Sequence, residues 1–256
     1  MSATLRTPPE ARIGDVAVSA AHPAVIAPIV GTDLSAILDQ AARIAATDVD
    51  LVEWRADHFA ALGDPAAVGE AARRVRDAAR RPVIFTIRSR AEGGAFEGDE
   101  STYVAALEAA CAGGAVDAAD IEHALPGAET MMTWLGDRGL TAIVSRHVLD
   151  ATPPRTELLV ALAAMEATPA AIVKLAVQAN TRRDAETVMA ALTARYRVAD
   201  KPLIVLAMGA AGAFTRLAGP RLGCAATFVA VAGASAPGQP SLAELRRAWA
   251  ALGQAE

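Results

Sequence analysis

The sequence predicts an α/β protein that folds as a single (β/α)8 barrel. Short apolar runs rich in β-branched residues recur at intervals of roughly 25 to 35 residues, and each is followed by an alanine-rich amphipathic stretch. Eight such runs fit one closed barrel, and the chain of 256 residues has the length of such a barrel. An open, doubly wound parallel sheet is the alternative.

The predicted strands are the eight apolar runs, at residues 24–30, 50–55, 82–88, 116–122, 141–147, 171–177, 202–208 and 222–231. The helical stretches between them include residues 33–46, 65–80, 100–112, 154–167, 181–197 and 241–252. Several begin at Asp, Thr, Pro or Ser, as helix N-termini do. No Pro-rich or Gly-rich linker and no run of charge divides the chain, so we expect one domain over residues 1–256. Residues 1–20 are predicted to be a partly ordered N-terminal extension with a frayed start.

Composition excludes several classes of protein. A hydrophobic fraction of 53% excludes a disordered chain, and a net charge of −5 with scattered basic residues disfavours nucleic-acid binding. Cys111 and Cys224 have neither metal-ligand spacing nor a disulfide framework, which suits a reducing cytoplasm. The nearest approach to a membrane helix, at residues 224–238, is shorter than the roughly 18 apolar residues required. We therefore expect a cytoplasmic protein.

A lysine in the sixth predicted strand raises the question of function. Lys174 lies inside the apolar segment "AIVKLAV", and only two of the 24 basic residues are lysines, the other being Lys201. A charged side chain inside such a strand must be desolvated, paired or reactive. Arginine stays protonated, whereas a buried lysine can become a neutral, nucleophilic amine. Burial, together with the cations of Arg55 and Arg88, is expected to disfavour the ammonium form of Lys174.

Side-chain alternation predicts that polar groups of five strands share the barrel lumen. Alternate residues of a strand point to the same face, and barrel active sites lie at the carboxyl ends of the strands. On the face shared with Lys174, each of these five strands becomes polar toward its carboxyl end. The polar lumen residues predicted in this way are Glu53, Arg55, Thr86, Arg88, Asp120, Glu122, Ser145, His147 and Lys174.

These residue types suit Schiff-base chemistry. A lysine amine condenses with a ketone to give an iminium that acidifies the adjacent C–H, and His147 then supplies a general acid and base. Glu92, followed by two glycines, is the candidate carboxylate that orients His147, with an ordinary solvated loop glutamate as the alternative. His123 is a rival base. No dinucleotide or Walker motif is present and the histidines lack metal-ligand spacing, so we expect neither a metal nor a cofactor.

Seven segments in chain order resemble the type I 3-dehydroquinate dehydratase family, and the resemblance covers about residues 24–250. They are "DLVEWRAD" (50–57), "PVIFTIRSRAEGGAFEG" (82–98), "ADIEHAL" (119–125), "IVSRHVLDATP" (143–153), "IVKLAV" (172–177), "AMGAAGAFTRLAG" (207–219) and "CAATFVAVAGASAPGQPSLAELR" (224–246). The resemblance implies a syn elimination of water from 3-dehydroquinate, which gives 3-dehydroshikimate in the shikimate pathway of aromatic amino acid biosynthesis. It also implies a homodimer.

The resemblance assigns a role to each matching residue. Lys174 is the Schiff-base lysine, His147 is the base, and Glu92 is the partner of His147. Arg216 holds the substrate carboxylate, because a planar guanidinium suits that group. The remaining implied substrate-binding residues are Glu53, Arg55 and Arg88 at the ring hydroxyls, Met208 against the ring, and Ser235 and Gln239 on a closing loop.

The chain departs from the family pattern without losing a reacting group. The departures are Arg146, Thr215, Cys224 and His123. A class I aldolase, with Gly209 and Gly212 around a substrate phosphate, is one competing interpretation, and a non-catalytic barrel is another. Quinate breakdown is an alternative role for the same dehydration.

Overall fold

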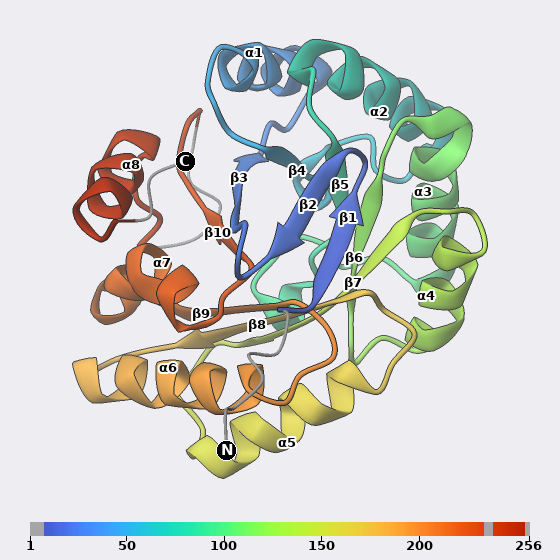
Figure 1. Ribbon diagram of the computed structural model, residues 1–256. Coiled ribbons are helices and arrows are strands. Elements are labelled where there is room, and N and C mark those ends of the chain that lie inside the picture. Colours follow the sequence, from blue (N-terminus) through green and yellow to red (C-terminus); the bar gives the residue numbers. More distant parts are fainter. Residues whose placement is uncertain (1–7, 233–237, 254–256) are drawn as a thin grey trace.

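Eight parallel strands form the centre of the structure, and helices surround them (Figure 1). The computed structural model describes residues 8–232 and 238–253. The barrel strands are β3 (Ala24–Ile29), β4 (Leu51–Arg55), β5 (Val83–Thr86), β6 (Ala118–Glu122), β7 (Thr141–Val148), β8 (Ile172–Gln178), β9 (Leu203–Met208) and β10 (Ala226–Phe228). The surrounding helices are α1 (Leu34–Ala45), α2 (Pro65–Ala79), α3 (Glu100–Cys111), α4 (Ala128–Gly136), α5 (Arg155–Glu166), α6 (Arg182–Tyr196), α7 (Ala213–Ala218) and α8 (Leu242–Ala251).

Strand order confirms the barrel. The hydrogen-bonded order is β10-β3-β4-β5-β6-β7-β8-β9, and every neighbouring pair is parallel. The two ends of this order meet at a bridge between Leu203 and Cys224, where the Ala225 amide donates to the Leu203 carbonyl at 2.7 Å. The prediction of a (β/α)8 barrel is therefore confirmed, and the alternative of an open doubly wound sheet is wrong.

The last barrel strand is shorter than predicted. The sequence indicated a strand over 222–231, whereas β10 spans only Ala226–Phe228. The chain just before it forms a 3-10 turn, Gly219–Leu222, which ends at Gly223 with a φ of 105°. An apolar run contains too little information to separate such a turn from a strand.

Helix amphipathicity follows the predicted spacing. In α1 the buried residues Ile37, Ala41 and Ile44 lie on one stripe of the helix, and Asp33 caps its N-terminus by accepting from the Ala36 amide at 2.9 Å. These apolar stripes pack on barrel strands whose outward residues, such as Trp54 and Phe85, are also buried. The helices therefore fix the positions of the strands.

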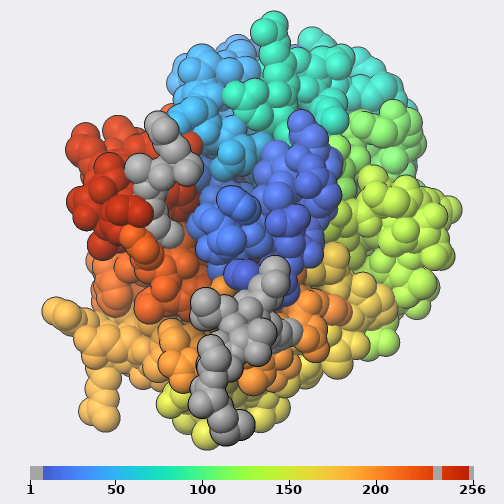
Figure 2. Space-filling view, in the orientation of Figure 1, coloured from blue at the N-terminus to red at the C-terminus, as the bar shows by residue number. Residues whose placement is uncertain are grey.

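A β-hairpin covers the amino ends of the barrel strands. It consists of β1 (Glu10–Ile13) and β2 (Val16–Ser19), and it lies across the centre of the face seen in Figures 1 and 2. Thr141, the first residue of β7, donates to the Arg12 carbonyl at 2.5 Å. Ile13 and Val18 are fully buried. This part of the predicted N-terminal extension is thus ordered rather than frayed, because two of its side chains complete the core.

We expect Ile13→Ala to destabilise the protein by about 2–5 kcal/mol, because it leaves a cavity under the hairpin. Urea unfolding of the variant should show a lower midpoint. Val160→Ala is the matched control, since Val160 is 69% exposed and its truncation should change the unfolding free energy by less than about 0.5 kcal/mol. Equal stability of the Ile13 variant and the wild type would contradict a sealing role for the hairpin.

Candidate active site

The lysine of β8 donates to two carboxylates in the barrel lumen. Lys174 Nζ lies 2.8 Å from Asp120 Oδ2 of β6 and 3.1 Å from Glu53 Oε1 of β4. All three residues are at most 6% exposed. These contacts join strands far apart in the sequence, and they confirm that alternate residues of these strands share the lumen.

The electrostatic expectation for Lys174 left out its carboxylate neighbours. The sequence led us to expect that burial and the nearby cations of Arg55 and Arg88 would disfavour the ammonium form of this lysine. The charged groups within hydrogen-bonding distance of Nζ are instead the carboxylates of Glu53 and Asp120. The ring of Phe228 adds a further favourable contact for a cation, with its centroid 4.7 Å from Nζ. Two carboxylates and an aromatic ring therefore contact this nitrogen.

Arg88 links the acidic groups of the lumen. Its Nη2 donates to Asp120 Oδ1 at 2.6 Å, and its Nη1 donates to Ser145 Oγ at 2.9 Å. Nη1 also lies 3.1 Å from Glu122 and 3.3 Å from Glu92. Burial by itself lowers the pKa of Arg88, but the charges of Asp120 and Glu122 outweigh it and raise that pKa. Arg88 is a permanent cation that fixes the positions of these carboxylates.

A second arginine is fixed in the same way near the cavity mouth. Arg55 Nε and Nη2 each donate to a carboxylate oxygen of Asp57, both at 2.8 Å. The Ala95 amide donates to Asp57 Oδ2 at 3.0 Å. The pair therefore connects β4 to the loop that carries Glu92.

Glu92 contacts His147 across the mouth of the barrel. Glu92 Oε2 lies 2.9 Å from His147 Nδ1 and accepts from the His147 amide at 3.1 Å. The following turn requires glycine, because Gly93 has a φ of 85° and a Cβ on Gly94 would lie 2.0 Å from the Arg88 carbonyl oxygen. The structure thus forms the pair that the sequence predicted, and Glu92 is not an ordinary solvated loop glutamate.

Burial sets the protonation states of this pair. It raises the pKa of Glu92 to about 7, with Arg88 opposing and Glu122 adding to the shift. Burial, then the cations Arg88 and Lys174, lower the pKa of His147 well below its ordinary value. The imidazole is therefore neutral at pH 7. When ionised Glu92 accepts the Nδ1 proton, Nε2 carries a lone pair, as a general base requires.

A cavity of about 220 Å³ lies at the carboxyl ends of the strands and brings these groups together. Nine of the ten predicted site residues are in its lining, and the tenth, Ser235, is outside the described residues. The lining consists of Glu53, Arg55, Arg88, Glu92, Gly93, His147, Leu149, Lys174, Ala176, Gln178, Leu206, Met208, Arg216, Phe228 and Gln239.

Arg216 differs from the other arginines of the cavity. It is 2% exposed, and its Nε has no hydrogen-bond partner among the described residues. Burial lowers its pKa to about 10, so the guanidinium remains charged at neutral pH. A buried cation without a paired carboxylate is costly, and an anionic ligand would remove that cost.

Sequence reasoning left some functional neighbours without a role. Asp120, Glu122 and Ser145 were placed on the lumen face by alternation, but only their contacts to Arg88 and Lys174 reveal what they do. Gln178 lies two residues beyond Ala176 on the same face of β8, so alternation could also have placed it in the cavity.

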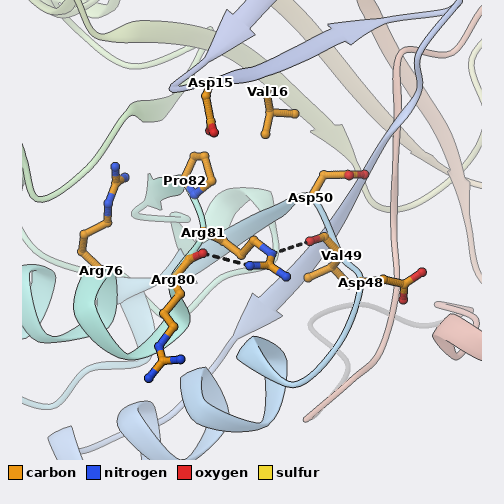
Figure 3. A pocket seen from close by; sticks show the side chains of 9 residues that line it. All are labelled: Asp15, Val16, Asp48, Val49, Asp50, Arg76, Arg80, Arg81 and Pro82. Carbon is orange, nitrogen blue, oxygen red and sulfur yellow. Dashed lines mark hydrogen bonds between the residues drawn. The ribbon is translucent and has the colours of Figure 1, made fainter.

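A second hollow, at the opposite end of the barrel, contains none of the predicted site residues (Figure 3). Its central side chain, Arg81, donates to the backbone carbonyls of Val49 at 2.8 Å and Arg80 at 3.0 Å. Lys201, which precedes β9, likewise donates to the Thr168 carbonyl at 2.6 Å. These cations stabilise loops.

Within residues 8–232 and 238–253, no group of three or more His, Cys, Asp or Glu side chains is arranged to hold a metal ion. None of the helices there is both long and apolar enough to cross a membrane.

Fold and site together define a TIM-type (β/α)8 barrel whose lysine, histidine and glutamate meet in one cavity at the carboxyl ends of the strands. The chain belongs to the type I 3-dehydroquinase family, whose model matches residues 25–256. The 3-dehydroquinate dehydratase of Salmonella paratyphi B is 35% identical over 95% of this chain and 98% of the relative.

Solved structures agree with this assignment. The 3-dehydroquinate dehydratase of Geobacillus kaustophilus has a TM-score of 0.93 and 33% identity, with 97% of this chain and 98% of that chain covered. The type I enzyme of Clostridium difficile, solved with covalently modified comenic acid, has a TM-score of 0.90 and 26% identity, with 96% and 98% covered.

We predict that the ring tautomer of His147 changes with pH near neutrality. Above about pH 7 ionised Glu92 accepts the Nδ1 proton, whereas protonated Glu92 can no longer do so as the pH falls through about 7. Nitrogen-15 shifts of the histidine ring should show the Nδ1–H tautomer at high pH and its loss at lower pH. Glu92→Gln should abolish the transition. A transition that persists in this variant would show that another group controls the tautomer.

Proposed function

We propose that this chain dehydrates 3-dehydroquinate to 3-dehydroshikimate through a Schiff base on Lys174. The observation that carries the proposal is a buried lysine amine in the same cavity as a neutral histidine paired with a glutamate. Membership of the type I 3-dehydroquinase family supports the choice of substrate. The reaction class is a hydro-lyase elimination.

The cavity supplies a complement for each polar group of 3-dehydroquinate. Arg216, in the cavity lining, has an Nε without a partner among the described residues, and it would bind the carboxylate. Lys174 would then face the C3 ketone, and His147 the C2 proton. Glu53, Arg55 and Arg88 would bind the ring hydroxyls, with Met208 against the ring. Gln239 lies in the cavity lining, and Ser235, which is outside the described residues, stays a substrate-binding residue implied by the family resemblance.

Imine formation conserves the single positive charge on the lysine nitrogen. The Lys174 ammonium and the C3 ketone give an iminium and one water, since two of the three nitrogen protons leave with the ketone oxygen. A proton must leave the nitrogen before it attacks, because only the neutral amine is nucleophilic. The N–C bond that forms replaces the C=O bond that breaks.

The elimination uses the iminium as an electron sink. His147 Nε2 removes the C2 proton, and the electron pair moves to the nitrogen to give a neutral enamine. The enamine expels the C1 hydroxyl, which takes the proton from His147 and leaves as water, and the iminium is restored. Hydrolysis then releases 3-dehydroshikimate and Lys174. The charges that develop during these steps lie on the lysine nitrogen, on His147 and on the substrate.

The aldolase alternative lacks support in the cavity. It placed Gly209 and Gly212 around a substrate phosphate, but close packing by itself explains why both positions are glycine. A Cβ on Gly209 would lie 2.6 Å from Gln178 Nε2, and one on Gly212 would lie 2.4 Å from the Ala207 carbonyl oxygen. The family supports dehydration of 3-dehydroquinate in the shikimate pathway, and quinate breakdown stays the alternative role for the same reaction. The homodimer and the cytoplasmic location stay predictions from the sequence.

Borohydride tests the Schiff base directly. Added together with 3-dehydroquinate, it should reduce the iminium and inactivate the enzyme irreversibly, and peptide mapping should find the added mass on Lys174. Lys174→Arg should lose labelling and nearly all activity, because a guanidinium cannot form the imine. Lys201→Arg is the matched control. This variant should still be labelled on Lys174 and should remain active. Labelling of Lys201, or an active Lys174→Arg variant, would refute the proposal.

Replacement of Arg216 tests the carboxylate site. Arg216→Gln should raise KM for 3-dehydroquinate by about 100-fold, because loss of one partner of a buried charge pair costs at least about 2–5 kcal/mol. Borohydride should still label Lys174 at a saturating substrate concentration. An unchanged KM would move the carboxylate to another part of the cavity. Circular dichroism and the melting temperature establish that the variant is folded.

A further inference from the structure

Two carboxylates contact Lys174, but an iminium can keep only one of them. The ammonium has three N–H groups and donates to both Glu53 and Asp120. After condensation with a ketone the nitrogen has a single N–H group, while its positive charge is unchanged. One carboxylate must therefore give up its hydrogen bond to this nitrogen, and the other must stabilise the iminium.

Access from the cavity distinguishes the two carboxylates. Glu53 lies in the cavity lining, where a substrate can reach it, whereas Asp120 is 1% exposed and is not part of the lining. Asp120 therefore contacts the nitrogen from outside the part of the lumen that a substrate can enter.

Asp120 is also fixed in place and remains charged. Oδ1 accepts from Arg88 Nη2 at 2.6 Å and from Ser145 Oγ at 2.5 Å, which leaves Oδ2 directed at Lys174 Nζ at 2.8 Å. Burial by itself raises the pKa of this carboxyl, but the cations Arg88 and Lys174 outweigh it and hold the pKa well below its usual range. Asp120 is thus a fixed anion next to Lys174.

We propose that Asp120 is the counter-ion of the Lys174 iminium, which keeps the imine nitrogen protonated through the reaction, while Glu53 exchanges its contact with Lys174 for a contact with the substrate. The proposal rests on the Schiff-base function given above. Protonation matters because a neutral imine is a much weaker electron sink than an iminium. A fixed anion at this distance favours the protonated form.

Asp120→Asn tests the proposal, because it removes the charge and keeps the shape. The imine should then lose its proton at lower pH, so kcat should decline toward high pH with a midpoint about 1 to 3 pH units below that of the wild type. Trapping by cyanoborohydride, which reduces the protonated imine, should decline over the same range. Asp120→Glu should restore the wild-type midpoint even where turnover remains reduced.

Two control variants separate this role from a structural one. Glu122→Gln removes another buried carboxylate from Arg88 but none from Lys174, so it should leave the midpoint of the alkaline decline unchanged. Glu53→Gln should raise KM and also leave that midpoint unchanged. If Asp120→Asn does not fold, Glu53→Gln decides the question. A midpoint lowered by Glu53→Gln would assign the counter-ion to Glu53 and overturn the proposal.

Failure of this inference differs from failure of the proposed function. A wild-type enzyme that borohydride does not label on Lys174 would refute the Schiff base itself. Labelling of the wild type, with an unchanged alkaline midpoint in folded Asp120→Asn, would refute only the counter-ion role. A uniform loss of kcat at every pH would likewise reduce Asp120 to a structural residue.

Discussion

The buried charges of the barrel lumen have to neutralise one another. The arrangement of side chains in the carboxyl-terminal half of the barrel depends on this requirement. A lysine can occupy a strand covered on all sides only if its charge is paired, and Asp120 and Glu53 supply the pairing. Asp120 in turn needs Arg88, and Arg88 brings Glu122 and Glu92 within its reach. The ionic network therefore positions the nucleophile and the carboxylate of the histidine pair together, so that a change at one member is transmitted to the others.

The two kinds of basic side chain have separate tasks within this network. Arg88 and Arg55 hold carboxylates through fixed, planar contacts and remain charged, which suits permanent connections between strands and loops. Lys174 is the basic residue of the cavity that can both carry a charge and give up its proton. Arg216 is the third case, a buried guanidinium whose Nε has no partner among the described residues, and this leaves it suited to an incoming carboxylate.

Stability and chemistry are concentrated at opposite ends of the same strands. The amino ends are closed by the hairpin β1–β2 and by arginines such as Arg81 that donate to backbone carbonyls. The carboxyl ends contain an open cavity in which the pKa of Glu92 lies near neutrality. This separation is general in such barrels, because the loops after the strands can vary without disturbing the core. It also explains why the hairpin variant and the Asp120 variant should report on different properties of the enzyme.

The sequence by itself determined the fold class, the approximate positions of the eight barrel strands and the lumen-facing side chains of five of them. The reason is local: apolar run length, helix caps and a two-residue alternation act along the chain, so Lys174 and Ser145 could be placed on one face without coordinates. Only the tertiary structure decided which of these side chains contact one another. The contacts of Lys174 with Asp120 and Glu53 span 54 and 121 residues of sequence, and no local rule fixes their distance. The tertiary structure also decided the sign of the charge next to the lysine, because that sign depends on which carboxylates the closed barrel brings to Nζ.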